Sequence, residues 1–258
     1  MIKVLLFDLD GTLLTSGKTI SAQTLDTLGK CRNKGLLVGV ATFRSRQNSL
    51  KYIAELSPDH IISSGGALIS RGGEHIYSAE FGVDEVNRII RISREIVGAD
   101  CEITVDTLDS HYWNYKTDPK NIDRHWDGTV YCDFAEDFTE PSLKICVEIA
   151  DDEKADRLRN ALSEYDCIRF TDGNWYKFTK KEATKENAIL KLCDSLGITP
   201  DDVMAFGDDL ADMGMLKMCG IGVAMGNAVD EVKAMADIVI GTNDEDGIAD
   251  FLEERFLR

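Results

Sequence analysis

The stretch Asp-Leu-Asp-Gly-Thr-Leu, residues 8–13, stands directly behind a largely apolar run, residues 3–7. The run has the length of one buried strand, and the Asp-x-Asp-Gly sequence behind it is a turn-forming group. A similar arrangement returns late in the chain, where the apolar residues 203–207 lead into Asp208. Strands that end in carboxylates predict a sheet whose strand ends carry the functional side chains.

Strands and helices alternate around these two runs. A helix that begins near Ser21 and ends at Gly35 is followed by a buried strand over residues 36–41. The same order returns in the last third of the chain, where Thr184 can cap a helix that Gly197 ends. This alternation predicts an α/β fold, a Rossmann-like parallel sheet with helices on both faces.

The middle of the chain follows a different pattern. A helix with one apolar face is followed by strand-like runs, and Asp172-Gly173-Asn174 is a hairpin signal. Such an order is typical of an α+β module. We therefore expect residues 1–81 and 182–258 to form one discontinuous core, and residues 82–181 to form an inserted α+β domain.

Composition excludes several classes of partner. The 258 residues carry a formal net charge of −17, whereas nucleic acids and anionic membranes need a cationic surface. The seven cysteines are an odd number without a C-x-x-C pair, which indicates reduced thiols and neither a disulfide framework nor a zinc site. The apolar start is too short for a signal peptide or a membrane span, so we expect a soluble, cytoplasmic protein.

Polar side chains gather where the predicted strands end. Asp8 and Asp10 follow the first strand, Thr42 the second and Asp208 a later one, while a helix beginning at Lys185 brings an ammonium group. Carboxylates alone would repel one another, so a divalent cation is implied, and oxygen ligands favour Mg²⁺. A metal beside a lysine and a helix N-terminus forms a receptor for phosphate.

These residues resemble the four ordered motifs of the haloacid dehalogenase superfamily of phosphatases. The motifs are residues 8–13, Thr42, Lys185 and the run Gly-Asp-Asp-Leu-Ala-Asp at 207–212. The run at residues 222–228, with the position and size of the insertion, is similar to the Cof-type branch. That branch carries a large cap domain of the C2 type between the second and third motifs.

The resemblance implies a mechanism. Asp8 would attack phosphorus and form an aspartyl-phosphate, while Asp10 would act as general acid and then as general base. Asp8, the carbonyl oxygen of Asp10 and Asp208 would hold Mg²⁺. Thr42 and Lys185 would bind the phosphoryl oxygens, and Asp212 would support the metal ligands or orient Lys185.

Four positions depart from the family pattern. Ala211 stands where asparagine is usual, Phe43 and Glu186 stand where glycine is common, and Gly65 replaces the asparagine of an Asn-Gly-Ala run. None of these changes removes the nucleophile, the acid or a primary metal ligand. They bear on substrate choice and turnover more than on the type of reaction.

Selectivity would come from the inserted domain, because the core supplies only phosphate chemistry. His111 and Trp113 lie in the stretch that most resembles a ligand-binding segment, although the same strand could pack into its own core. Arg44, close behind Thr42, is the third expected substrate contact. The expected substrate is a small phosphorylated metabolite such as a sugar phosphate.

Two other functions remain compatible with the sequence. A phosphotransferase or phosphomutase could use the same aspartyl-phosphate and pass the phosphoryl group to a sugar hydroxyl. A non-catalytic protein could bind Mg²⁺ and a phosphorylated metabolite, although the presence of Asp8 and Asp10 favours catalysis.

Overall fold

The computed structural model describes residues 1–115, 128–170 and 173–257, and its chain forms two compact units. The first unit is assembled from segments far apart in the sequence: Met1–Arg44, Ser49–Tyr77 and Thr184–Arg258. The second unit consists of Ser45–Asn48 and Ser78–Ala183.

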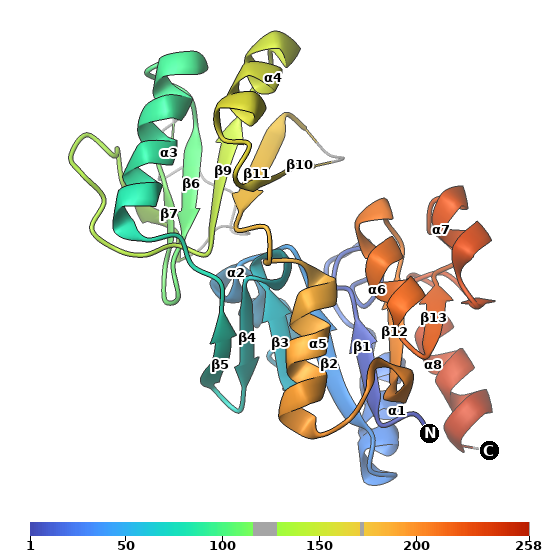
Figure 1. The fold of residues 1–258 in the computed structure, drawn as a ribbon. Helices are drawn as coiled ribbons and strands as arrows, with labels where there is room; N and C mark the ends of the chain where they lie inside the picture. Colours follow the sequence, from blue (N-terminus) through green and yellow to red (C-terminus); the bar gives the residue numbers. More distant parts are fainter. Residues whose placement is uncertain (116–127, 171–172, 258) are drawn as a thin grey trace. The chain divides into compact units, whose positions relative to one another are not determined.

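An eight-stranded sheet organises the first unit, in the order β14-β13-β12-β1-β2-β3-β4-β5. β1 pairs in parallel with β2 on one side and with β12 on the other, which confirms the predicted α/β class with a parallel sheet (Figure 1). The strands are β1 (Val4–Phe7), β2 (Leu37–Ala41), β3 (His60–Ser63), β4 (Leu68–Arg71), β5 (Glu74–Ser78), β12 (Val203–Gly207), β13 (Ile221–Ala224) and β14 (Ile238–Val239).

One edge of this sheet was not predicted. β4 pairs antiparallel with β3, and β5 lies beside β4. Gly72 and Gly73 connect β4 to β5 with φ angles of +56° and +90°. Two successive residues with positive φ form the tight turn that suits a hairpin, and glycine adopts it without a Cβ clash.

Two helices of the first unit, α1 and α5, begin and end where the sequence predicts. Ser21 accepts a hydrogen bond from Thr24 N at the start of α1, and Thr184 accepts one from Asn187 N at the start of α5. Gly197 ends α5 in the left-handed conformation. The helices are α1 (Ala22–Asn33), α5 (Lys185–Leu196), α6 (Met213–Met218), α7 (Asp230–Met235), α8 (Gly247–Leu252) and α2 (Arg46–Ile53), whose first three residues belong to the second unit.

The core of the first unit holds the two strands that lead into the aspartates. Phe7 of β1 and Phe206 of β12 are paired in register and stack with ring centroids 4.4 Å apart. Both side chains are fully buried, together with the other residues of β1. Burial of this kind stabilises the strand ends, so the residues that follow them are held on a rigid base.

The second unit is a six-stranded sheet, ordered β10-β11-β9-β6-β7-β8, with two helices on one face (Figure 1). β7 and β8 pair in parallel and the other pairs are antiparallel, including the predicted hairpin of β10 and β11. Asp172 of that hairpin signal lies outside the described residues. The elements are α3 (Val83–Ile96), β6 (Ile103–Asp106), β7 (His111–Trp113), β8 (Val130–Tyr131), β9 (Lys144–Glu148), α4 (Asp152–Ala161), β10 (Asp166–Arg169) and β11 (Trp175–Thr179).

Residues alternate between the two faces of this sheet. Val105 of β6 and Ile145 of β9 pack with α3 and α4 in an apolar core. Their neighbours Asp106 and Lys144 point to the opposite face, since successive side chains of a strand alternate. One face of the second sheet is therefore apolar and the other is polar.

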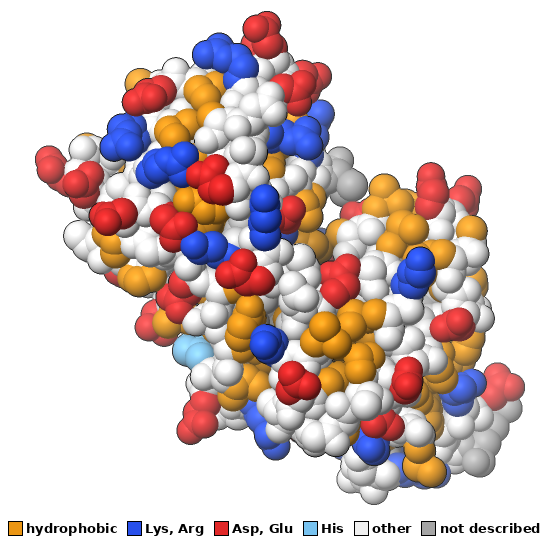
Figure 2. Space-filling model, viewed as in Figure 1, with side chains coloured by type: hydrophobic (Ala, Val, Ile, Leu, Met, Phe, Trp, Pro, Cys, Tyr) orange, Lys and Arg blue, Asp and Glu red, His pale blue; other side chains and the backbone are white. Residues whose placement is uncertain are grey.

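The surface carries charges of both signs. On the face shown in Figure 2, acidic and basic side chains are interspersed, so the net negative charge is not gathered there into one patch. Within residues 1–115, 128–170 and 173–257, no helix combines the length and the apolar character that crossing a bilayer requires.

Candidate active site

Three aspartates meet where β1 and β12 end. Asp8 follows β1 and donates its backbone N–H to the carbonyl oxygen of Phe206, 2.9 Å away, while Asp208 follows β12. Asp8, Asp208 and Asp212 each bring one carboxylate oxygen to within 4.8 Å of the others. The carboxyl ends of neighbouring parallel strands thus produce a compact acidic cluster.

Lys185 lies against this cluster. Its ammonium nitrogen is 2.6 Å from one oxygen of Asp8 and 2.6 Å from one oxygen of Asp212. The position of Lys185 depends on Gly66, which has a φ of +105° and touches the start of α5. A Cβ on Gly66 would lie 2.1 Å from the carbonyl oxygen of Thr184, so only glycine permits this approach.

Asp212 uses both of its carboxylate oxygens. One accepts from Lys185, and the other accepts from the backbone N–H groups of Asp208 and Asp209, at 3.1 Å and 3.3 Å. These bonds fix the turn after β12 as well as the direction of the lysine. Ala211, which departs from the family pattern, precedes Asp212 in the short 3₁₀ helix Leu210–Asp212.

Asp208 is positioned from the opposite side by the turn after β1. The hydroxyl of Thr12 donates to one oxygen of Asp208 at 2.7 Å. Gly11 has a φ of +78°, and a Cβ there would lie only 2.3 Å from the other Asp208 oxygen. We did not predict a role for Thr12, although it stands within the motif that carries Asp8.

The cluster holds more negative than positive charge. Burial raises the pKa of Asp8 well above its usual value, and the nearby Asp212 carboxylate adds to the rise while Lys185 opposes it. Burial likewise raises the pKa of Asp208 to about 6, assisted by Asp212 and Asp209 and opposed by the hydroxyl of Thr12. One ammonium therefore does not neutralise three carboxylates, and a further cation would fit among them.

Burial alone would lower the pKa of Lys185, but the charges of Asp212 and Asp8 outweigh it and raise that pKa instead. Lys185 therefore stays an ammonium at neutral pH. A permanently charged lysine in contact with a carboxylate can also bind the oxygens of a phosphoryl group.

Asp10 is not part of the acidic cluster. Its carboxylate binds Arg44 through two hydrogen bonds, of 2.6 Å and 2.8 Å, and Lys18 through a third of 2.7 Å. Burial opposes ionisation, but the two cations outweigh it and lower the pKa of Asp10. Arg44, which we expected to contact substrate, thus contacts Asp10. Lys18 also contacts Asp10, and no motif in the sequence indicated this contact.

Thr42 and Phe43 lie on the loop between β2 and α2. The buried hydroxyl of Thr42 accepts from the backbone N–H of Arg44 at 3.1 Å, and it retains its own proton as a donor. The ring of Phe43 lies 5.1 Å from the ammonium of Lys185, at the position where glycine is common in the family. An aromatic face at this distance attracts the cation.

His111 and Trp113 belong to β7 of the second unit. His111 is buried and hydrogen-bonded through Nδ1 to Asp106. Trp113 packs against Trp175 and Tyr115, with ring centroids 6.0 Å and 4.8 Å away. Both residues take part in clusters of their own unit.

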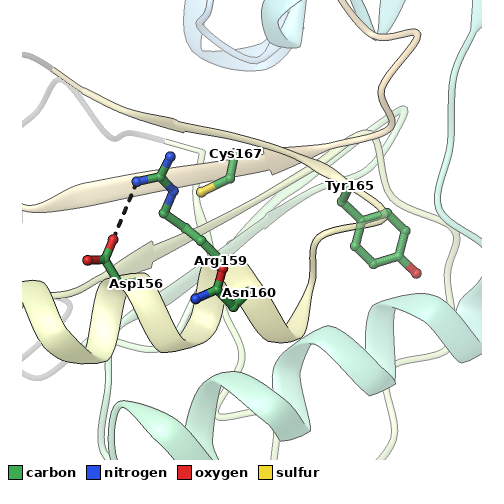
Figure 3. Close-up of a pocket in the computed structure, with 5 residues that line it drawn as sticks. All are labelled: Asp156, Arg159, Asn160, Tyr165 and Cys167. Carbon is green, nitrogen blue, oxygen red and sulfur yellow. Dashed lines mark ion pairs between the residues drawn. The ribbon is translucent and has the colours of Figure 1, made fainter.

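A separate pocket of about 350 Å³ lies beside α4 and β10 (Figure 3). Arg159 at its wall is paired with Asp156 at 3.5 Å. Burial raises the pKa of the Cys167 thiol to about 12, so this cysteine is not a nucleophile at neutral pH. The pocket thus offers space but no reactive group comparable to the aspartate cluster.

Comparison with known proteins agrees with this geometry. The sequence model of the haloacid dehalogenase-like hydrolases matches residues 5–252. The 5-amino-6-(5-phospho-D-ribitylamino)uracil phosphatase YcsE of Bacillus subtilis is 30% identical, over 96% of this chain and 93% of its own.

Two solved structures of similar fold also belong to the haloacid dehalogenase superfamily. A haloacid dehalogenase-like hydrolase from Bacteroides thetaiotaomicron is 25% identical, with a TM-score of 0.85 over 99% of this chain and 100% of its own. A subclass IIB sugar phosphatase of the same superfamily is also 25% identical, with a TM-score of 0.83 over 99% of this chain and 100% of its own.

An acidic cluster with a buried lysine, at the carboxyl ends of a parallel sheet, defines an enzyme of the phosphatase type. The chain belongs to the haloacid dehalogenase-like hydrolase family, in its Cof-type branch.

Proposed function

We propose that this protein is a Mg²⁺-dependent phosphomonoester hydrolase that acts through an aspartyl-phosphate on Asp8. The observation that carries this proposal is the contact of Asp8 with the buried ammonium of Lys185, inside a cluster of three carboxylates. A carboxylate held in this way is fixed in place as a nucleophile and lies next to a charge that can bind the phosphoryl group.

The donor set fits a hard divalent cation. Asp8 and Asp208 each have a carboxylate oxygen in the cluster, and the carbonyl oxygen of Asp10 would complete the protein ligands. Asp212 serves as a support, because its two oxygens already bind Lys185 and backbone N–H groups. When bound, Mg²⁺ would offset the charge of the carboxylates and of the phosphate, so that the anionic nucleophile can approach it.

The chain's own groups then account for both half-reactions. A carboxylate oxygen of Asp8 attacks phosphorus, and the bond from phosphorus to the ester oxygen breaks. Asp10 gives a proton to the leaving oxygen and later takes one from the water that releases phosphate. Lys185 and the hydroxyl of Thr42 hold the phosphoryl oxygens throughout.

Asp10 needs a change of contacts to act as an acid. Arg44 and Lys18 bind its carboxylate, and both favour the ionised form. For proton transfer, Asp10 has to exchange at least one of these cations for the leaving oxygen. We infer that substrate binding brings about this exchange.

We further propose that the second unit is the cap that selects the substrate, and that the substrate is a small phosphorylated metabolite such as a sugar phosphate. Support comes from the polar face of its sheet and from the relatives, one of which is a sugar phosphatase and another a phosphatase of a ribityl phosphate.

The test is hydrolysis of p-nitrophenyl phosphate by the wild type and by Asp8→Asn, with Mg²⁺ or with EDTA. We expect activity that needs Mg²⁺ and is lost in Asp8→Asn. Trapping the phosphorylated enzyme by acid quench, followed by mass spectrometry, should locate the added phosphate on Asp8. Unchanged activity in Asp8→Asn would overturn the proposed nucleophile.

A further inference from the structure

Two asparagines join the turn after β1 to loops near the end of the chain. Asn227 lies in the loop after β13, and its side-chain Nδ2 donates to the carbonyl oxygen of Gly11 at 2.7 Å. Asn243 lies in the loop after β14, and its Nδ2 donates to the carbonyl oxygen of Leu14, also at 2.7 Å. All four residues belong to the first unit. The turn is therefore held by two side chains, one bound to Gly11 and the other to Leu14.

The orientation of the Asn227 amide follows from its partners. Gly11 offers a carbonyl oxygen, which can only accept a hydrogen bond, so the amide nitrogen faces it. The amide oxygen accepts from the backbone N–H of Asn243 at 3.1 Å. An aspartate would lack the donor, and an apolar side chain would lack both the donor and the acceptor. The contacts of Asn227 thus use both ends of an amide.

The backbone that carries Asn227 is itself fixed. Gly226 donates its N–H to the carbonyl oxygen of Gly241 at 3.0 Å, and Val229 donates its N–H to the carbonyl oxygen of Asp208 at 3.0 Å. The chain is thus anchored on both sides of Asn227, and one of the anchors is the aspartate that follows β12. A short side chain on such a base holds its partner in one place.

Gly11 links the contact of Asn227 to the acidic cluster. The nitrogen of Gly11 belongs to the same peptide group as the carbonyl oxygen of Asp10, which is a proposed ligand of Mg²⁺. Gly11 has a φ of +78°, and a Cβ on it would lie 2.3 Å from a carboxylate oxygen of Asp208. A shift of Gly11 would therefore move one proposed ligand and change the space beside another.

Leu14 lies against the same stretch of backbone. It forms an isolated bridge with Asp10, and it donates its N–H to the carbonyl oxygen of Leu9 at 2.9 Å. A bridge joins neighbouring stretches of backbone, so Asn243, through its bond to Leu14, steadies the stretch that lies beside Asp10. The two asparagines thus act on one small region of backbone.

We propose that Asn227 and Asn243 are positioning residues of the Mg²⁺ site, which hold the peptide group between Asp10 and Gly11 where its carbonyl oxygen can bind the cation. This inference rests on the proposed function, because Mg²⁺ and its ligands belong to that proposal. It extends the site to two neutral side chains, 216 and 229 positions beyond the residues that they bind.

The test measures Mg²⁺ affinity directly, by calorimetry in the absence of substrate. Binding heat that disappears in Asp208→Asn is assigned to the acidic cluster. Asn227→Leu keeps the branched shape and removes both hydrogen bonds of the amide. We expect it to bind Mg²⁺ at the cluster about 10–100-fold more weakly, as is typical when a residue that orients a metal ligand is lost. Asn243→Leu should weaken the affinity in the same direction.

Ser16→Ala is the matched control. The hydroxyl of Ser16 donates to Asp244 at 2.6 Å, so it joins the same two segments of the chain, but at the exposed tip of the turn. We expect Ser16→Ala and Asn227→Leu to lower the midpoint of urea unfolding with EDTA by similar amounts, and Ser16→Ala to leave the Mg²⁺ affinity unchanged. Asn227 is exposed, so its replacement opens no cavity in the core. Asn227→Ala removes the same two bonds and is the second variant, with the fold checked by circular dichroism.

The outcomes separate this inference from the proposed function. Wild-type Mg²⁺ affinity in a folded Asn227→Leu or Asn227→Ala protein would overturn the positioning role and leave the hydrolase intact. An equal loss of affinity in Ser16→Ala would also overturn it, because any contact between the two segments would then have the same effect. If the wild type itself binds no Mg²⁺ at the cluster and does not hydrolyse p-nitrophenyl phosphate, the proposed function fails, and the positioning role fails with it.

Discussion

Lys185 joins Asp8 to Asp212: its ammonium nitrogen lies 2.6 Å from an oxygen of each, and its side chain is 1% exposed. Asp8 directly follows β1, whereas Asp212 ends the short 3₁₀ helix Leu210–Asp212 after β12, so one lysine neutralises part of the charge of both segments. The same ammonium is held between a support residue and the proposed nucleophile. Under the proposed mechanism, stability and catalysis therefore depend on the same pair of contacts.

The first prediction concerns the loss of this ammonium. In Lys185→Met, three carboxylates would remain together without a buried cation, and breaking such a buried pair costs about 3–5 kcal/mol. We expect the free energy of unfolding of the metal-free protein to fall by that order, with hydrolysis abolished. Mg²⁺ should restore part of the stability, because it offsets the same carboxylates.

Urea unfolding with EDTA and with Mg²⁺ measures this effect. Lys191→Met is the control, because Lys191 is an exposed lysine of the same helix, α5. A stability loss of equal size in both variants would show that helix α5, and not the ion pairs, had been disturbed.

The second prediction separates backbone strain from contact with Asp208. Gly11 and Gly35 have φ angles of +78° and +89°, so alanine is strained at both, by about 1–2 kcal/mol. A Cβ at Gly11 would also lie 2.3 Å from an oxygen of Asp208, whereas at Gly35 it would meet nothing within 4 Å. We expect Gly11→Ala to weaken Mg²⁺ binding and hydrolysis at least about tenfold, and Gly35→Ala to change stability alone.

Calorimetric titration with Mg²⁺ tests both variants. Equal Mg²⁺ affinity in Gly11→Ala and wild type would mean that the turn after β1 does not position Asp208. A weakened affinity in Gly35→Ala would mean that general strain, and not the local contact, governs the site.

The strand ends and helix caps could be predicted because local patterns determine them. Asp8 and Asp208 each follow an apolar run of strand length, and Thr184 and Gly197 have the residue types that begin and end a helix. The sequence does not show which strands are neighbours. The contact of Asp8 with Lys185, 177 positions later, comes from the parallel pairing of β1 with β12 and from the packing of α5.

Other contacts between side chains could not be predicted from any local sequence pattern. Lys18 follows a glycine in an exposed turn, yet its ammonium lies 2.7 Å from Asp10. Arg44 reaches the same carboxylate from a different loop. The pairing of Asp106 with Lys144 depends on which residues of β6 and β9 stand opposite each other, and the alternation of residue types fixes the face of each strand but not this exact partner.

The third prediction concerns the acid role of Asp10. A p-nitrophenolate leaves without a proton, whereas the alkoxide of a sugar phosphate needs one, so loss of the acid should affect the two esters unequally. We expect Asp10→Asn to lower kcat for a sugar phosphate about 10²–10⁴-fold, and to lower formation of the phosphorylated enzyme from p-nitrophenyl phosphate much less. Single-turnover release of p-nitrophenol isolates that first step.

Asp8→Asn is the comparison for this experiment, because it should abolish the first step with both esters. An equal loss with the two esters in Asp10→Asn would contradict a role as acid and would indicate a role in binding Mg²⁺ or phosphate.

The last prediction follows from the raised pKa of Asp208, which burial and the neighbouring carboxylates cause. Its pKa in the folded protein is raised to about 6, above the value of about 3.9 in an unfolded chain. The metal-free fold therefore favours the protonated acid, and the stability from this group is fully present below about pH 4 and is lost as the pH rises through about 6. Burial raises the pKa of Asp8 in the same direction.

Mg²⁺ reverses this dependence, because it binds the ionised carboxylates and competes with their protons. The gain in melting temperature on adding Mg²⁺ should be small at about pH 5 and should grow as the pH rises to about 8. Differential scanning calorimetry with EDTA and with Mg²⁺ at both pH values measures this gain in melting temperature. Asp208→Asn should remove most of the increase in the gain between about pH 5 and about pH 8. A gain that is equal at the two pH values, or larger in acid, would mean that the cation does not bind at Asp208.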